Sequence, residues 1–147
     1  GGGDIILLPE IPFDIHRIGD AIINRLKKGK PYSIVVVAEG IPTIGGKKAA
    51  QYIAEEIEYE TGFETRETVL GYIQRGGSPT AYDRNLATRM GGHATELIAQ
   101  GMFGRMVALK GNAIESVPLS EVASKLKLVT EDHDLVVQGR RMGICFG

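Results

Sequence analysis

Apolar residues along the first two thirds of the chain form short runs that alternate with stripes of helical spacing. Three short segments are predicted strands, residues 4–8, 32–38 and 64–70. The second, YSIVVVA, is continuous and rich in β-branched residues, which is typical of a strand covered on both faces. Each strand precedes a stretch in which apolar residues recur every three or four positions. This order predicts a parallel sheet with helices on its faces.

The predicted helices carry start and stop signals as well as apolar stripes. Their limits are Asp14 to Gly29, residues 47–59 with Gly62 as the stop, and Ser78-Pro79 to Gly101. The inward-facing stripes are Ile15, Ile18, Ile22 and Leu26 in the first helix, Ala49, Ala50, Ile53 and Ile57 in the second, and Leu86, Met90, Ala94 and Leu97 in the third. These spacings place each set on one helix face.

The last third of the chain has a different pattern. Residues 105–109 and 113–117 flank the turn pair Gly111-Asn112, which predicts a hairpin that closes one edge of the sheet. Ser120 is expected to cap a short helix containing Val122 and Leu126, and residues 134–141 form a last predicted helix that is broken at Gly143. Together these elements predict an α/β fold of three layers, with a mainly parallel sheet flanked by helices.

The composition narrows the class of protein. With 147 residues, 43% of them hydrophobic, the chain is long and apolar enough for one packed domain. The net charge of −1 gives no reason to expect nucleic acid or a membrane as a partner. The apolar runs are far shorter than the ~20 residues of a spanning helix, and no secretory signal pattern opens the chain. A single cysteine excludes an internal disulfide framework, so we expect a cytoplasmic protein.

Ligands bind to parallel α/β sheets at the carboxyl ends of the strands. Those ends are predicted here at Pro9-Glu10, at Glu39-Gly40 and at residues 71–77. A carboxylate such as that of Glu10 can accept hydrogen bonds from sugar hydroxyls, although an isolated acid is more often a surface residue. Glu39-Gly40 is interpreted as a structural turn. The three ends form one predicted ligand-binding rim.

Arg75 is the strongest candidate for binding an anion. It lies before the paired glycines and the predicted helix start at Ser78, and a helix start favours anions through its free N–H groups and dipole. A guanidinium adds a fork shaped for phosphate or carboxylate. The alternative is that Arg75 pairs with Asp83 or a neighbouring acid and that the glycines serve only the turn.

Two further residues near Arg75 have simple structural interpretations. Arg66, with Glu64 and Glu67 around it, is by itself best explained as a solvated strand charge. Tyr72 could donate its phenol to an oxyanion, but a buried tyrosine with a satisfied hydroxyl is the simpler explanation. Neither residue identifies a site from its chemistry alone.

Common catalytic and metal-binding patterns are missing from the sequence. His16, His93, His133 and Cys145 have no spacing that fits a zinc site or a Cys-His nucleophile. His93, near the apolar stripe of the long helix, is expected to be a core or interface residue. The sequence contains no G-x-x-x-x-G-K-[ST], G-x-G-x-x-G or G-x-S-x-G pattern. We therefore expect neither a catalytic residue nor a metal ligand within these 147 residues.

One long segment nevertheless resembles a known family. The string ETRETVLGYIQRGGSPTAYDRNLATRMG, residues 64–91, is similar to the sugar-phosphate-binding segment of 6-phosphofructokinases. The segments Leu8-Pro9-Glu10, IVVVAEG at residues 34–40 and GRRMGICFG at residues 139–147 resemble other parts of that family. The resemblance covers essentially the whole chain and implies a partial phosphofructokinase fold.

The resemblance implies roles for individual residues. Glu10 would contact hydroxyls of fructose 6-phosphate, and Arg75 would hold the bound sugar phosphate. Arg66 would bind the 6-phosphate in the neighbouring subunit's site, which requires a homo-oligomer with shared active sites. Tyr72 stands where many members have histidine, so it keeps only one hydrogen-bond donor there. Ile73 and Gln74 complete this substrate-binding segment.

The resemblance also implies what lies outside these residues. The family's glycine loop, its T-I-D-N-D-type segment with the catalytic aspartate and its M-G-R motif are not found here. Mg²⁺ and the phosphoryl donor, ATP or pyrophosphate, would then bind mainly to residues absent from this chain. Residues 1–75 would belong to the sugar-phosphate lobe and residues 76–126 would cross to the nucleotide lobe. Residues 127–147 would form a tail that returns to the sugar-phosphate lobe.

Three functions are compatible with this pattern. The first is the carboxyl-terminal, fructose 6-phosphate-binding portion of a glycolytic 6-phosphofructokinase, a phosphotransferase, with no activity in isolation. The second is a stand-alone sugar-phosphate-binding or regulatory module. The third is a subunit-assembly domain in which Arg66 and Arg75 form ordinary ion pairs.

Overall fold

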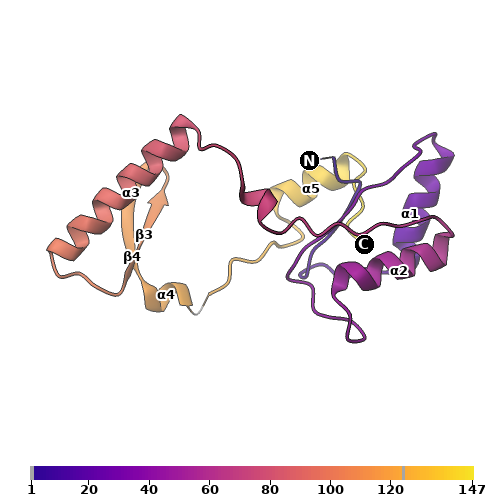
Figure 1. Ribbon diagram of the computed structural model, residues 1–147, viewed down its shortest axis with the longest axis horizontal. Helices are drawn as coiled ribbons and strands as arrows, with labels where there is room; N and C mark the ends of the chain where they lie inside the picture. Colours follow the sequence, from indigo (N-terminus) through magenta and orange to yellow (C-terminus); the bar gives the residue numbers. More distant parts are fainter. Residues whose placement is uncertain (1, 124) are drawn as a thin grey trace. The chain divides into compact units, whose positions relative to one another are not determined.

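The computed structural model describes residues 2–123 and 125–147 (Figure 1). The chain divides into two compact units, Gly1–Val69 with Leu128–Gly147 and Leu70–Lys127. Each unit has its own two-stranded sheet. No helix in the described part of the chain combines the length and apolarity needed to cross a membrane.

The first unit is built on parallel strands. β1 (Ile5–Leu7) pairs with β2 (Val35–Val37), with Ile5 opposite Val35. On the other edge of β1, Cys145 forms a parallel bridge with Ile5, and its carbonyl accepts the N–H of Ile6 at 2.8 Å. Three segments that are distant in sequence therefore form one parallel arrangement.

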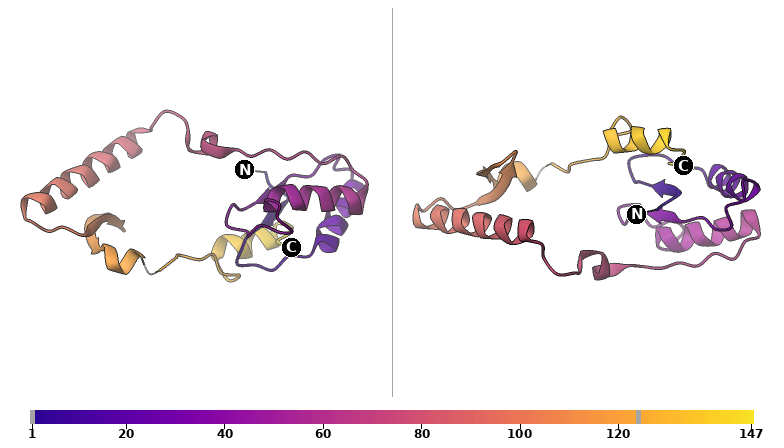
Figure 2. Two further views of the ribbon diagram at one scale, coloured as in Figure 1. Left: turned by 60° about the horizontal axis from the view of Figure 1, so that its bottom comes forward. Right: turned by 90° about the horizontal axis from the view of Figure 1, so that it is seen from above.

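Helices lie on both faces of β1. α1 (Ile15–Lys27) and α2 (Ala49–Thr61) lie on one face, and α5 (Asp134–Arg141) lies on the other (Figure 2). Side chains alternate along β1, so its two faces belong to two separate apolar clusters. The first consists of Ile5, Leu7, Ile18, Ile41, Ala49, Ile53 and Ile57. The second consists of Ile11, Val136 and Phe146, with Ile6 and Leu8 against it. This is the three-layer α/β arrangement that the sequence predicts.

α1 forms where the sequence signals place it. The Asp14 carboxylate accepts the N–H of His16 at 2.9 Å and so caps the helix start. Arg25, near the other end, forms a 2.8 Å ion pair with Asp4 just before β1. The second Asp4 oxygen accepts the N–H of Ile34 at 2.9 Å. One half-buried carboxylate therefore links α1 to the amino ends of both strands.

Two positions in this unit require glycine, each for a different structural reason. Gly62 caps the end of α2 with φ of +69°, in the left-handed region that glycine adopts without strain. A Cβ on Gly139, within α5, would lie 2.9 Å from the Phe146 ring. The missing side chain therefore lets the ring of Phe146 pack directly against the helix.

The second unit contains a short 3₁₀ helix, a long helix and a hairpin. Its elements are η1 (Gly71–Arg75), α3 (Ala81–Ala99), β3 (Arg105–Lys110), β4 (Ala113–Pro118) and α4 (Leu119–Ala123). β3 and β4 pair antiparallel, and α3 contacts both strands (Figure 1). The predicted hairpin is thus confirmed. Leu97 is the only buried hydrophobic residue among the described residues of this unit.

Several predictions about the sheet were wrong. Residues 64–70 form no strand, and the N–H of Thr65 bonds instead to the Glu58 side chain on α2. Val69 and Leu70, the two large apolar residues of this segment, are both exposed. β2 is shorter than residues 32–38 and is not covered on both faces, because Val36 is exposed on the side away from α1 and α2. The hairpin closes no edge of the parallel strands but forms a sheet of its own.

Two predicted helix starts were also displaced. α3 is capped by Thr80, whose hydroxyl accepts the N–H of Asp83, and not by Ser78. Ser120 lies inside α4 and does not precede it, while Leu126 lies beyond that helix and is exposed. At α3, the capping box formed by Thr80 and Asp83 sets the helix start in place of Ser78.

The link between α1 and α2 should depend on pH. His16 Nδ1 lies 3.1 Å from Glu60 Oε2, and the hydrogen bond and charge of Glu60, with Asp14, raise the pKa of His16 above 6.5. A raised pKa in the folded state means that the pair stabilises the fold below the unfolded pKa and loses this effect as pH rises through the folded value.

NMR titration should show the His16 pKa falling on Glu60→Gln. The matched change Glu56→Gln should leave it in place, and equal shifts in the two variants would contradict the assignment.

Candidate functional site

Glu10 follows β1 at its carboxyl end, as predicted. The residue is half-buried, and its Oε1 accepts the backbone N–H of Val129 at 3.1 Å. This bond joins segments 119 residues apart and fixes the direction of the carboxylate. Oε2 has no hydrogen-bond partner among the described residues and is therefore available to a hydroxyl donor.

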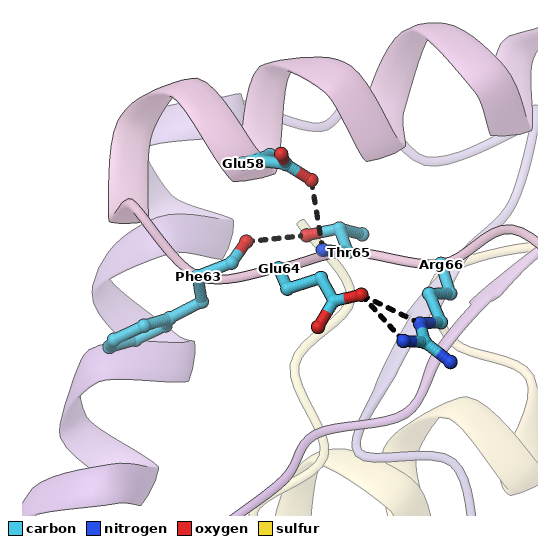
Figure 3. Close-up of polar contacts among 5 residues, drawn as sticks. All are labelled: Glu58, Phe63, Glu64, Thr65 and Arg66. Atoms are coloured by element: carbon cyan, nitrogen blue, oxygen red, sulfur yellow. Dashed lines mark hydrogen bonds and ion pairs between the residues drawn. The ribbon is translucent and has the colours of Figure 1, made fainter.

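Arg66 lies on the irregular segment between α2 and η1. Its guanidinium donates through Nε and Nη2 to the same Glu64 oxygen, at 2.8 and 2.7 Å (Figure 3). The Arg66 side chain is 82% exposed, so the pair is a surface ion pair in water. The arginine is a solvated charge in this subunit, as its local chemistry indicates, but it is not on a strand.

Arg75 and Tyr72 come together in η1. Residues three apart eclipse one another in a 3₁₀ helix, and the Arg75 guanidinium lies 6.0 Å from the centroid of the Tyr72 ring. All of the residues of η1 are exposed, including Ile73 and Gln74. The idea of a buried Tyr72 with a satisfied hydroxyl is therefore wrong. One short turn presents a phenol and a guanidinium side by side.

The start of α3 is closed by a capping box. Asp83 accepts the N–H and the hydroxyl of Thr80, both at 2.8 Å, and these bonds lower the pKa of its carboxyl. The Asp83 carboxylate therefore lies at the positive, amino-terminal end of the α3 dipole. The suggested Arg75–Asp83 pair is also not formed, and Arg75 has no ion pair among the described residues.

The remaining candidates have structural explanations. Residues 39 and 40 form a turn after β2. His93 is half-buried on α3, with its Nδ1 3.7 Å from a Glu96 oxygen. No group of three or more His, Cys, Asp or Glu residues gathers in the described part of the chain in a way that could hold a metal ion.

A cavity of about 370 Å³ lies within the first unit. Its walls are apolar side chains of α1, β2 and α2, and residues 30–33 and 63–68 form the rest of its lining. Sequence reasoning did not find this cavity, because it depends on residues 64–70 staying unpaired beside β2.

The predicted site residues belong to both units. Glu10 and Arg66 are in the first, whereas residues 72–75 are in the second. Sequence reasoning found Glu64 near Arg66 but missed the tether from Glu58 to Thr65. The only signal for the Glu64–Arg66 pair is their spacing of two, which puts side chains of an extended chain on one side.

Comparisons with known proteins identify the family. The sequence profile named Phosphofructokinase matches residues 1–98. The chain is 80% identical over its full length to "ATP-dependent 6-phosphofructokinase 3" of Bacteroides thetaiotaomicron, and covers 44% of that protein. It is 43% identical to the ATP-dependent 6-phosphofructokinase of Chloroflexus aurantiacus, again covering 44% of the relative. The chain therefore belongs to the phosphofructokinase family, as the resemblance of residues 64–91 indicated.

Solved structures agree with this assignment. The chain superposes on a pyrophosphate-dependent phosphofructokinase from Nitrosospira multiformis with a TM-score of 0.70 and 28% identity, covering 87% of this chain and 35% of that one. The α/β fold class is thus confirmed as a part of the phosphofructokinase fold. The chain spans less than half the length of the relatives it matches.

Proposed function

We propose that this chain is the carboxyl-terminal part of an ATP- or pyrophosphate-dependent 6-phosphofructokinase and supplies residues that bind fructose 6-phosphate. The 80% identity over all 147 residues to one such enzyme, with 44% of that enzyme covered, carries the proposal. The full-length protein would transfer a phosphoryl group to the 1-hydroxyl of the sugar in glycolysis. Cytoplasmic localisation and assembly into a homo-oligomer remain predictions.

The proposed role of these residues is to hold the acceptor. A sugar phosphate presents a dianion at one end and several hydroxyls at the other. Arg75 and Arg66, the latter reaching into a neighbouring subunit's site, would bind the dianion through their forked N–H groups. Tyr72 would donate one hydrogen bond, and Ile73 and Gln74 would line the turn between them. The free oxygen of Glu10 would accept a hydrogen bond from a hydroxyl.

Phosphoryl transfer depends on positioning and charge neutralisation, so a fixed acceptor contributes directly to the rate. Mg²⁺ and the donor are implied by the family, and the metal would neutralise charge on the transferred group. The described residues contain no cluster of three or more metal-ligating side chains. In this proposal the catalytic residue and the groups that bind Mg²⁺ and the donor belong mainly to the part of the full-length protein outside these residues.

In this proposal the functional division lies close to the boundary between the two units, although residues 70–75 belong to the second unit. Residues 1–75 and 127–147 would belong to the sugar-phosphate lobe, and residues 76–126 would cross to the nucleotide lobe. The second unit, Leu70–Lys127, buries only one hydrophobic side chain among its described residues, Leu97. Exposed apolar residues such as Phe103 and Leu119 need a covering surface, which the rest of the full-length protein would supply.

A coupled assay for fructose 1,6-bisphosphate tests the proposal. The full-length protein should form it from fructose 6-phosphate with ATP or pyrophosphate, and the 147-residue polypeptide should not. Turnover by the short polypeptide would contradict its assignment as a non-catalytic part. Calorimetry separates the other two functions: saturable binding of fructose 6-phosphate by the short polypeptide supports a binding module, and no binding by the full-length protein supports an assembly domain.

A further inference from the structure

The segment between α2 and η1 is held to α2 by a chain of hydrogen bonds. The Thr61 hydroxyl donates to the Ile57 carbonyl at 2.7 Å and accepts the N–H of Phe63 at 3.2 Å. The next anchor is the N–H of Thr65, which donates to Glu58 Oε2 at 2.9 Å (Figure 3). Residue 64 therefore lies between two fixed points of the backbone.

The fixed backbone sorts the side chains of this segment onto two sides. Thr65 and Glu67 point toward α2, where they line a second cavity with Gln51, Ala54, Glu55 and Glu58. Glu64 and Arg66 do not line that cavity and project together on the other side of the chain (Figure 3). Side chains that alternate between two sides with a period of two are expected for an extended backbone.

The ion pair on that side occupies one edge of the guanidinium. Nε and Nη2 of Arg66 both donate to Glu64 Oε1. An arginine binds a phosphate through such an edge, in the same forked geometry that it uses for a carboxylate. A phosphate that takes this edge must therefore replace Glu64.

We propose that Glu64 is a positioning residue that competes with the substrate phosphate for Arg66. This inference rests on the proposed function, in which Arg66 binds the 6-phosphate. In the free subunit the Glu64 carboxylate holds the guanidinium over its own segment. When the sugar phosphate binds, the dianion displaces the monoanion from the Nε edge, and Glu64 turns to water.

The exposure of the pair limits the size of the effect. Both side chains are exposed, and such pairs are worth little because water and salt screen them. Removing the competitor should therefore lower the KM for fructose 6-phosphate by about two- to five-fold. The charge at residue 67 provides the comparison, since Glu67 is adjacent to Arg66 in sequence but lines the cavity on the α2 side.

The test uses the full-length enzyme with Glu64→Gln, Glu67→Gln, Arg66→Ala and the double variant R66A/E64Q. E64Q should lower KM with little change in kcat, and E67Q should not. In the R66A background, E64Q should have no further effect, because the competition no longer exists. A lower KM for E64Q in both backgrounds would assign the effect to general charge and overturn the proposal.

The remaining outcomes separate this inference from the proposed function. If R66A raises KM but E64Q leaves it unchanged or raises it, Glu64 is no competitor, while the role of Arg66 stands. If R66A itself leaves KM unchanged, the assignment of Arg66 to the phosphate fails and the inference falls with it. Salt gives a further readout: the KM advantage of E64Q should shrink as ionic strength rises.

Discussion

Replacing Arg75 with alanine in the full-length enzyme should raise the KM for fructose 6-phosphate about 100-fold. Hydrogen bonds to charged groups are each worth about 1.5–3 kcal/mol, and a forked contact to a dianion supplies two of them. About 3 kcal/mol corresponds to roughly two orders of magnitude in affinity. The fold should not change, because Arg75 is exposed and its guanidinium lies over the Tyr72 ring, which is exposed as well.

Steady-state kinetics and thermal unfolding together check this prediction. Arg75→Lys keeps the charge but loses the fork, so it should give a smaller increase in KM. Arg17→Ala removes an exposed arginine from α1 and should leave KM unchanged. If Arg75→Ala and Arg17→Ala have the same KM, Arg75 binds no substrate, and an ordinary surface role accounts for it.

Replacing Ile53 with alanine should destabilise the protein by about 3 kcal/mol. Ile53 is 1% exposed and packs from α2 into the cluster with Ile5, Leu7 and Ile18. A buried isoleucine cut to alanine loses apolar burial and leaves a cavity, at a cost of about 2–5 kcal/mol. The neighbouring cavity of about 370 Å³ already borders Ile53, so the walls have little support with which to close the new space.

The matched control lies on the same helix. Tyr59 is 85% exposed, so Tyr59→Ala removes a larger side chain with an expected effect within about 0.5 kcal/mol. Denaturant unfolding of the full-length variants, with hydrogen exchange of the α2 amides, measures both. If Ile53→Ala lowers the free energy of unfolding no more than Tyr59→Ala does, this packing of α2 is contradicted.

The elements that local signals specify were predictable from the sequence. α1 has a capping Asp14, a stripe of isoleucines and a glycine after its end, and it forms as predicted. The hairpin follows from the Gly111-Asn112 turn, and α2 from its apolar face with Gly62 as the stop. In these cases, residues close in sequence determine the structure.

The features that depend on distant partners were not predictable in the same way. Residues 64–70 were predicted as a strand from their sequence. In the structure the N–H of Thr65, which could pair with a neighbouring strand, donates instead to the Glu58 side chain. Likewise, the hairpin pairs only with itself, which no local pattern reveals. The cap of α3 could have been found, because Thr80 and Asp83 have the spacing of a capping box.

In the candidate site, too, some features were predictable from local sequence and others depend on distant partners. The position of Glu10 after β1 follows from the rule for parallel strands, but its anchor at Val129 lies 119 residues away. The pairing of Tyr72 with Arg75 needs a 3₁₀ turn in place of a strand end. The chemistry of the residues was thus readable in sequence, whereas their partners were not.

Mixed oligomers give the most direct test of the claim that Arg66 and Arg75 bind one phosphate from two subunits. Full-length R66A and R75A subunits should each form poorly active homo-oligomers. When the two are combined, a shared site made of Arg75 from one subunit and Arg66 from the other is intact, so the account predicts that fructose 6-phosphate turnover returns at low substrate concentration. Mixed oligomers no more active than the average of their parents would contradict it.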